Sequence, residues 1–477
     1  MTAANRLSRP VAAAMRLSAV VLCLFLAAAP ARAQSPEPPE PTAPIVVPRD
    51  ERLYALAVLW HEAKINFAYF DHVPDLDWDQ AYRDFIPLVI EEEDPYRFYR
   101  LLQRFYALLR DGHTDVWMPQ QLLEGMGRAP VRFVPVEDRY ILSNIGRDWS
   151  DPSLIGAELV AVDGVPVQEF VRSEIDPYLC VSTDHVRTDA GAGWLPLGPI
   201  GVEAKFTLRT PSGDSRELTL PRRHHNLRTE WAMPTTPRTP AFEWRWVGEP
   251  DERIAWVAMR SFESDEVVAG FRAALPDLLT ARALIIDLRV NGGGSSYHSA
   301  AIASHLTDAP LTGSAWRTRE RRAAFTAWGR WEDPAGMGAD VRDYAADNAW
   351  YRGEPDIVEP APDPAQRFLG PVVILTDHPT ASAAEDFLIY LDKRPNLTKV
   401  GRPTNGSTGQ PTPIELPGGG GARVCTKRDT YPDGRDFVGV GVLPDVLVPR
   451  SIEEIIAGQD RILDRGLETA RSMLAAP

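Results

Sequence analysis

Two short and almost uninterrupted apolar segments, LIIDLRV (284–290) and PVVILTD (371–377), restrict the fold of this chain more than any other feature. Strands that are apolar throughout are typical of parallel sheets covered on both faces, because a sheet with one wet face alternates apolar and polar residues. From residue 253 onward, predicted strands alternate with predicted helices such as VVAGFRAALPDLLTA (267–281). This order predicts an α/β core built on a parallel sheet.

The first apolar segment leads into three consecutive glycines, Gly292 to Gly294. Glycine lets the backbone come close to a ligand and turn its amides toward it. The segment fits neither GxxxxGK[ST] nor GxGxxG, so a phosphate-binding loop is not indicated. The amides suit an oxyanion equally well, and an oxyanion is the charge that develops in acyl transfer.

The second apolar segment leads through a Thr-Ala-Ser turn into a helix predicted to begin at Ser382. Ser382 and Glu385 fit the S-x-x-E capping box, in which the serine only satisfies an amide of its own helix. The position also suits a nucleophile, because free first-turn amides and the helix dipole favour negative charge nearby. Both turns would lie at the carboxyl edge of a parallel sheet, where ligands bind in open α/β folds.

His113 lies far upstream, in RDGHTDVW (110–117), on a predicted Asp111-Gly112 turn that precedes a short alternating stretch. A histidine on such a turn is either a solvated loop residue or, as neutral imidazole near pH 7, a general base. The neighbouring residues leave both interpretations open.

The first 33 residues have a basic start, the apolar stretch Leu17 to Ala29, and Ala31-Arg32-Ala33, the layout of a secretory signal. We expect cleavage after Ala33 and export to the periplasm or beyond the cell. The apolar stretch is shorter than the roughly 20 residues that span a bilayer, and no later segment reaches that length. Residues 34–48 are rich in proline and are predicted to form an extended spacer.

The remaining chain divides into four predicted parts. Residues 49–122 carry apolar side chains at helical spacing, and residues 123–222 consist of short strands and turns, including a Pro-Ser-Gly-Asp hairpin turn. Residues 223–248 have no periodicity and are predicted to be a linker, while residues 249–477 form the α/β core. Within the core, residues 307–367 contain four tryptophans without a clear period and are predicted to be an excursion that borders a site.

Cysteine usage and charge exclude several classes of protein. Only Cys180 and Cys425 remain after the predicted signal, so they pair or stay free, and no Cys/His spacing indicates zinc or another metal. The formal net charge of −15 argues against nucleic acid as a partner.

Several of these motifs, together with two longer segments, resemble the S41 serine peptidases of the tail-specific protease and tricorn-core group. The motifs are DLRVNGGG, TASAAE and DGHTDV, with GAELVAVDGVPVQEF similar to part of a PDZ-type module and GVGVLPDVLVPRSIEEIIAGQDRILDRGLE similar to the family's closing segment. The resemblance implies a crotonase-like (ClpP/crotonase-type) α/β catalytic core with a helical unit over 49–122 and a PDZ-like β module over 123–222.

The resemblance also implies site residues. Ser382 would be the nucleophile, and the amides of Ala383 and of Gly292 or Gly293 would form the oxyanion hole. One branch of the family uses a lysine where this chain has Ser407, which leaves His113 as the base, as in the tricorn-like branch.

The glutamate that orients the histidine in the tricorn-like branch is replaced here by Val438. Asp436 is our candidate for the third catalytic residue. Asp433, Asp115 and Glu385 are the alternatives, and spacing does not separate them.

The sequence therefore predicts an exported serine peptidase that acts on peptides or unfolded proteins through an acyl-enzyme, without cofactor or metal. Two other functions stay open, because an oxyanion hole does not distinguish esters from amides and the fold can bind ligands without turnover. They are a serine esterase and a catalytically silent binding protein. The oligomeric state is not predicted.

Overall fold

The computed structural model describes residues 44–475 except 150, 225–226 and 332–338. The predicted signal and most of the predicted spacer lie outside these residues. No helix within the described part of the chain is both long and apolar enough to cross a membrane.

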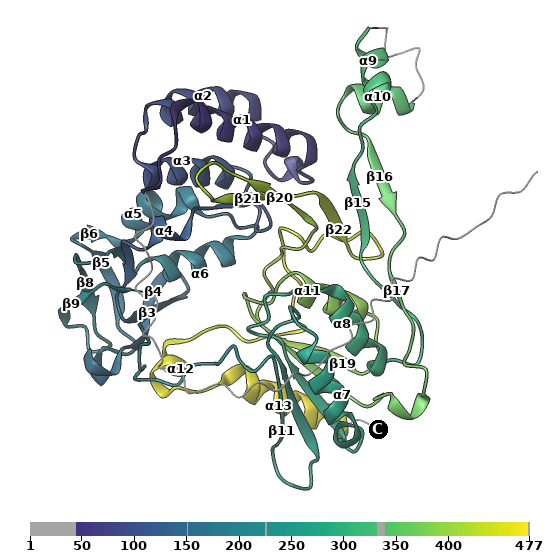
Figure 1. The fold of residues 1–477 in the computed structure, drawn as a ribbon. Coiled ribbons are helices and arrows are strands. Elements are labelled where there is room, and N and C mark those ends of the chain that lie inside the picture. The colour runs from purple at the N-terminus through teal and green to yellow at the C-terminus, as the bar shows by residue number, and fades with distance from the viewer. Residues whose placement is uncertain (1–43, 150, 225–226, 332–338, 476–477) are drawn as a thin grey trace, which may run out of the picture. The chain divides into compact units, whose positions relative to one another are not determined.

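A six-stranded sheet forms the centre of residues 242–448 (Figure 1). Its five strands from β12 onward are parallel, which confirms the prediction from the two apolar segments. The edge strand β11 runs antiparallel to β12. In spatial order the strands are β11 (Phe242–Val247), β12 (Ile254–Met259), β13 (Ala283–Asp287), β18 (Val372–Thr376), β19 (Leu397–Gly401) and β23 (Val446–Leu447).

Both faces of this sheet are covered, which explains why its central strands are apolar throughout. Leu284 and Ile374 face one hydrophobic cluster, and their chain neighbours Ile285 and Val373 face another. The first face packs against α7 (Glu266–Leu278), α8 (Ser296–Ala303) and α11 (Ala383–Tyr390), and the second against α13 (Arg461–Ala475).

The predicted linker over 223–248 is partly wrong. Its last part is β11, and Arg223–His224 forms β10, which pairs with β2 (Met126–Arg128). Side chains of β11 alternate between partly buried and exposed for most of its length, as in an edge strand with one covered face. Because this pattern is weak, the sequence did not predict a strand here.

The N-terminal helices are α1 (Arg49–Asn66), α2 (Trp78–Glu91) and α3 (Pro95–Ala107), with Asp77 and Asp94 capping the last two. They share one hydrophobic cluster with the first face of the sheet. After α3, β1 (Asp115–Trp117) pairs with β21 (Gly421–Cys425), whose other neighbour is β20 (Pro411–Glu415). This pairing fixes the turn that carries His113 against the C-terminal part of the chain.

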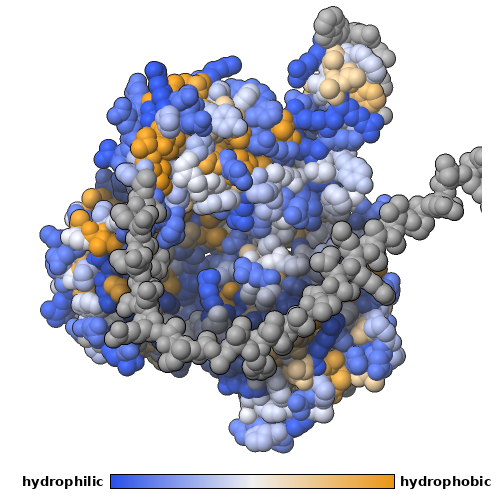
Figure 2. Space-filling model, in the orientation of Figure 1, coloured by the Kyte–Doolittle hydropathy of each residue, from blue (hydrophilic) through white to orange (hydrophobic). Residues whose placement is uncertain are grey.

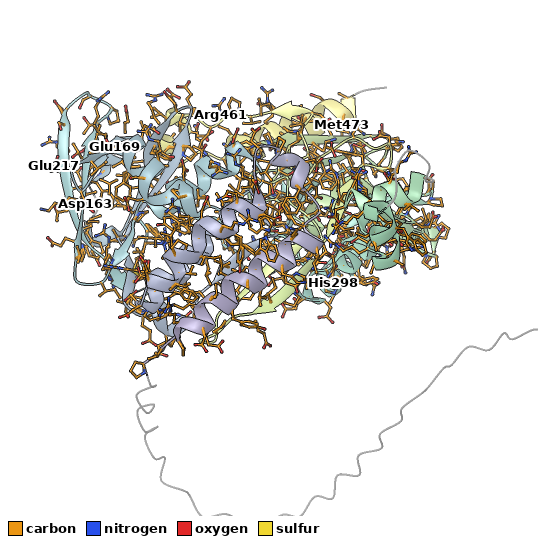
Figure 3. All side chains as sticks on the ribbon, turned by 90° about the horizontal axis from the view of Figure 1, so that it is seen from above. Asp163, Glu169, Glu217, His298, Arg461 and Met473 are labelled. Atoms are coloured by element: carbon orange, nitrogen blue, oxygen red, sulfur yellow. The ribbon has the colours of Figure 1, made fainter. Side chains whose placement is uncertain are left out.

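A β-rich module with its own hydrophobic cluster follows. Its Asp163, Glu169 and Glu217 lie at the opposite side from His298 and Met473 in Figure 3. The predicted hairpin consists of β8 (Glu203–Arg209) and β9 (Ser215–Pro221).

The sequence did not indicate that the β-rich module also contains helices. Its further elements are β3 (Val131–Val136), β4 (Arg139–Ile145), β5 (Glu158–Val162), β6 (Val165–Pro166), α5 (Val167–Phe170), α6 (Asp184–Trp194) and β7 (Leu197–Pro199).

The predicted excursion forms a projecting arm (Figure 1). Its strands β15 (Ala315–Arg319) and β16 (Trp350–Gly353) pair, and β15 also pairs with β22 (Lys427–Thr430). Helices α9 (Ala323–Trp331) and α10 (Ala339–Ala345) form the end of the arm. The surface visible in Figure 2 is mostly hydrophilic, with apolar side chains gathered over α1 to α3. The remaining elements are α4 (Gln120–Leu123), β14 (Leu311–Thr312), β17 (Ile357–Val358) and α12 (Ile452–Ala457).

Candidate active site

Ser382 connects β18 to α11 at a strained position. Its backbone angles are φ 54° and ψ −124°, a conformation that residues other than glycine rarely adopt. Such strain costs about 1–3 kcal/mol and persists at functional sites because the surrounding structure holds it. A strained serine between a strand and a helix is the arrangement that exposes the nucleophile in α/β-hydrolases.

The structure brings His113 to Ser382, although 269 positions separate them in the chain. His113 Nε2 lies 3.3 Å from Ser382 Oγ, and Nδ1 lies 2.6 Å from the hydroxyl of Ser407. The turn is built by Asp111, whose side chain accepts the backbone N–H of His113 at 3.2 Å and the hydroxyl of Thr114 at 2.6 Å. The imidazole is therefore held between two serine hydroxyl groups.

The electrostatic surroundings keep His113 neutral. Burial and, to a smaller extent, the positive charge of Arg423 together lower the pKa of His113 to about 4. Burial raises the pKa of Asp111 to about 6, although Thr114 and Ser182 donate hydrogen bonds to its carboxyl group. A neutral imidazole beside a serine hydroxyl can accept its proton at pH 7.

The glycine turn approaches Ser382 so closely that a side chain is excluded. A Cβ atom on Gly293 would lie 2.6 Å from Ser382 Cβ, and Gly293 has φ +101°. A Cβ atom on Gly292 would meet nothing within 4 Å. The space beside Gly292 is therefore open, whereas the space beside Gly293 is filled by Ser382.

The backbone amides separate Gly292 from Gly293 as candidates for the oxyanion hole. The N–H of Gly293 already donates to Asn291 Oδ1 at 2.9 Å. Within the described part of the chain, the N–H groups of Gly292 and Ala383 have no acceptor. The geometry therefore favours Gly292 with Ala383 over Gly293 with Ala383 as the pair of donors.

Glu385 connects the serine turn to the segment that carries Ser407. Its carboxyl group is fully buried and accepts backbone N–H groups from Ser382 at 3.1 Å, Ser407 at 3.1 Å and Gly406 at 2.7 Å. The hydroxyl of Thr404 donates to it as well. Burial raises the pKa of Glu385 to about 8 despite these four donors.

Asp436 does not reach His113 in this structure. Its carboxylate lies 3.4 Å from Arg428, and its side chain is 50% exposed. Our assignment of Asp436 as the group that orients His113 therefore needs correction, because Arg428 holds this aspartate and Ser407 occupies His113 Nδ1. Val438, at the position of the family's glutamate, is buried and apolar.

The other candidate carboxylates bond to groups other than the imidazole of His113. Asp115 pairs with Arg423 across β1 and β21, and Asp433 pairs with Arg435. The residue that sequence reasoning missed is Ser407. Its only signal was its position, where one branch of the family has a lysine.

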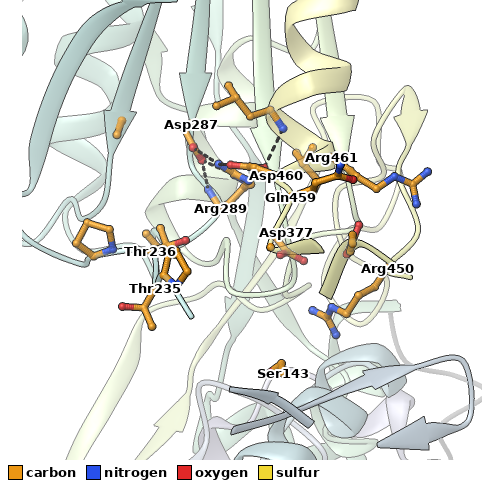
Figure 4. Close-up of a pocket in the computed structure, with 18 of the residues that line it drawn as sticks. Ser143, Thr235, Thr236, Asp287, Arg289, Asp377, Arg450, Gln459, Asp460 and Arg461 are labelled. Atoms are coloured by element: carbon orange, nitrogen blue, oxygen red, sulfur yellow. Dashed lines mark hydrogen bonds and ion pairs between the residues drawn. The ribbon is translucent and has the colours of Figure 1, made fainter. Parts of the chain in front are cut away.

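The residues that flank the two turns have structural partners. Arg289 pairs with Asp287 at 2.6 Å, and it also bonds to Asp460 (Figure 4). His378 bonds to Asp189 of α6 at 2.6 Å, which links the β-rich module to the turn before Ser382. Cys180 and Cys425 are both free thiols. Among the described residues, no group of three or more His, Cys, Asp and Glu side chains is arranged to hold a metal ion.

Part of the chain is similar to known proteins in sequence, and most of it is similar to known structures in fold. Residues 253–448 match the model of peptidase family S41. A search of curated proteins finds no match. Among solved structures, mature CPAF has a TM-score of 0.69 at 16% sequence identity, covering 89% of this chain and 98% of that chain. A putative peptidase from Parabacteroides merdae ATCC 43184 has a TM-score of 0.50 at 19% identity, covering 90% of this chain and 97% of that chain.

At these low identities the solved structures show a shared fold, and the similarity to family S41 rests on the family model over residues 253–448. The family match covers both turns of the site, because Gly292 and Ser382 lie within residues 253–448. The part of the chain that carries these two turns, residues 253–448, is similar to peptidase family S41.

Proposed function

We propose that the protein is an exported serine peptidase that hydrolyses peptide bonds through an acyl-enzyme at Ser382, with His113 as the general base. The observation that carries this proposal is the strained Ser382 whose Oγ lies 3.3 Å from the Nε2 of a neutral His113. The fold and family support peptides or unfolded proteins as substrates. The motifs quoted above support a crotonase-like core and a PDZ-like module, and the N-terminal pattern supports export.

In the first step, Ser382 Oγ attacks the carbonyl carbon of the scissile bond, and His113 Nε2 takes the hydroxyl proton. The carbonyl electrons move to the oxygen, and the N–H groups of Gly292 and Ala383 stabilise the resulting oxyanion. One donor of this kind contributes about 3 kcal/mol to transition-state stabilisation. When the tetrahedral intermediate collapses, the C–N bond breaks and the proton passes from His113 to the leaving amine.

In the second step, water attacks the acyl ester while His113 Nε2 accepts a proton from that water. The intermediate collapses, the C–O bond to Ser382 breaks, and His113 returns the proton to Ser382 Oγ. The carboxylic acid product leaves, and every proton is accounted for by the imidazole.

The experiment that tests this function measures cleavage of an unfolded protein and of a peptide and ester panel by residues 34–477. We expect Ser382→Ala and His113→Ala to lose at least about 10³-fold in kcat while their circular dichroism spectra stay unchanged. Ser472→Ala and His61→Ala, at exposed positions, are the matched controls and should behave as wild type. Equal turnover by wild type and Ser382→Ala would overturn the proposal, and cleavage of esters alone would favour an esterase.

A further inference from the structure

A histidine base needs one nitrogen free of a proton and the other nitrogen protonated and held. In this site the second nitrogen, Nδ1, meets the hydroxyl of Ser407 at 2.6 Å. No carboxylate in the described part of the chain bonds to either nitrogen of His113. The role that a buried carboxylate has in a Ser-His-Asp triad therefore falls to a neutral hydroxyl group.

The position of Ser407 is fixed on every side. Its side chain is 1% exposed, its N–H donates to Glu385, and its carbonyl oxygen accepts the N–H of Ser382 at 3.0 Å. A Cβ atom on Gly112 would lie 2.7 Å from Ser407 Oγ, so only glycine allows the His113 turn to come this close. Contacts of this kind belong to a preorganised site, because they place the hydroxyl before substrate arrives.

A hydroxyl differs from a carboxylate in two ways that matter for catalysis. A carboxylate only accepts hydrogen bonds, so it enforces the Nδ1–H tautomer, whereas a hydroxyl both donates and accepts. A carboxylate also stabilises the imidazolium that forms in the transition state, and a neutral group does so less. The short distance between Nδ1 and Ser407 Oγ is compatible with Nδ1 as the donor, and only that tautomer leaves Nε2 free to accept the proton of Ser382.

We propose that Ser407 is the positioning residue of the catalytic histidine: its hydroxyl accepts the Nδ1–H of His113 and so selects the tautomer in which Nε2 acts as the base. The inference rests on the proposed function, since it assigns a partner to the base of that reaction. It identifies a Ser382–His113–Ser407 arrangement in which no carboxylate of the described residues bonds to the imidazole.

The test is a double-mutant cycle on kcat with the variants Ser407→Ala, His113→Ala and both together. We expect Ser407→Ala to lower kcat roughly fivefold to tenfold, the value of one neutral hydrogen bond, with KM unchanged. In the His113→Ala background the same substitution should have no effect, because the hydroxyl acts only through the imidazole. A merely structural role would lower the residual rate equally in both backgrounds and would overturn the inference.

A second measurement reads the tautomer directly. In protein labelled with ¹⁵N-histidine, the signals that disappear in His113→Ala belong to this residue. We expect wild type to show a protonated Nδ1 and a bare Nε2, Ser407→Ala to show a mixture, and Ser407→Thr to restore the wild-type pattern. Equal spectra for wild type and Ser407→Ala would contradict the inference. If His113→Ala itself keeps full activity, the proposed function fails instead, so the two failures are distinguishable.

Discussion

The carboxyl group of Glu385 accepts the backbone N–H of Ser382 at 3.1 Å, three residues before it in the chain. The same carboxyl group accepts the N–H of Ser407, whose hydroxyl holds His113. The capping interpretation and the nucleophile interpretation of Ser382 are therefore compatible. Glu385 bonds to the serine's amide, while the serine's hydroxyl lies beside the imidazole.

We predict that Glu385→Gln destabilises the fold and impairs catalysis together. A glutamine side chain offers one acceptor oxygen, so two of the donors now shared between Oε1 and Oε2 would face an NH₂ group. Each buried donor left without an acceptor costs about 1–3 kcal/mol. Urea unfolding at pH 9, above the pKa of about 8 at which Glu385 ionises, should show a loss of about 2–4 kcal/mol, whereas the exposed Glu468→Gln should stay within about 0.5 kcal/mol of wild type. Equal stability of the two variants would contradict the assigned role of Glu385.

The two glycines beside Ser382 should respond differently to a methyl group. Gly293→Ala places a Cβ atom 2.6 Å from Ser382 Cβ at a positive φ, so we expect a loss of activity of at least about 10²-fold. Gly292→Ala keeps the N–H and meets nothing within 4 Å, so the fold should stay intact, with any effect confined to KM. Thermal unfolding and steady-state kinetics of both variants check this contrast, and similar kinetics for the two would refute it.

Strain at Ser382 predicts that glycine is tolerated there better than alanine. The backbone angles of Ser382 lie in a region that favours glycine, and relief of strain outweighs the larger unfolded-state entropy of glycine. Both variants should be inactive. We expect the free energy of unfolding of Ser382→Gly, measured in urea, to be about 1 kcal/mol higher than that of Ser382→Ala. A more stable alanine variant would show that the position is not strained.

The pH dependence of activity should follow the lowered pKa of His113. Because the base must be neutral, kcat/KM should persist below the usual histidine pKa of about 6.5 and fall near pH 4. Arg423 is the charged group that acts on the imidazole, and Asp111 accepts the backbone N–H of His113, so titration of Asp111 near pH 6 is expected to change the slope of the profile. A fall in kcat/KM with a single midpoint at pH 6.5 would contradict the lowered pKa of His113.

The same pKa shift predicts how His113 affects stability. The unfolded chain binds a proton at this histidine below about pH 6.5, while the folded chain does so only near pH 4. The contribution of the neutral imidazole to stability is therefore full above pH 6.5 and is lost as the pH falls toward 4. His113→Asn should flatten this part of the stability profile in urea titrations across that range, and an unchanged slope would argue against the shift.

Substitution of Asp436 tests two roles for this residue. The sequence predicted that Asp436 orients His113, whereas in the structure it pairs with Arg428. Asp436 pairs with Arg428 at 3.4 Å and is half exposed, so Asp436→Asn should leave kcat within about twofold of wild type. A loss comparable to that of His113→Ala would show that this aspartate reaches the imidazole during turnover. The measurement is the rate of peptide cleavage at saturating substrate, compared between Asp436→Asn and wild type.

Local patterns in the sequence predicted much of the core. The parallel sheet followed from apolar runs that pack on both faces, and the two turns followed from glycines and a serine at strand ends. The weakly patterned β11 was missed, because an edge strand has one covered face and few apolar residues to mark it.

The sequence by itself predicted which strands are buried on both faces, where the chain turns at their ends, and that Ser382 and His113 are the candidate nucleophile and base. Only the tertiary structure decided that they meet, because the pairing of β1 with β21 closes a loop of about 300 residues whose ends local propensity does not bring together. It also decided that Ser407 rather than Asp436 contacts His113, and that Gly292 rather than Gly293 has a free amide. These choices depend on distances of a few ångströms between distant segments, which are set by packing rather than by spacing along the chain.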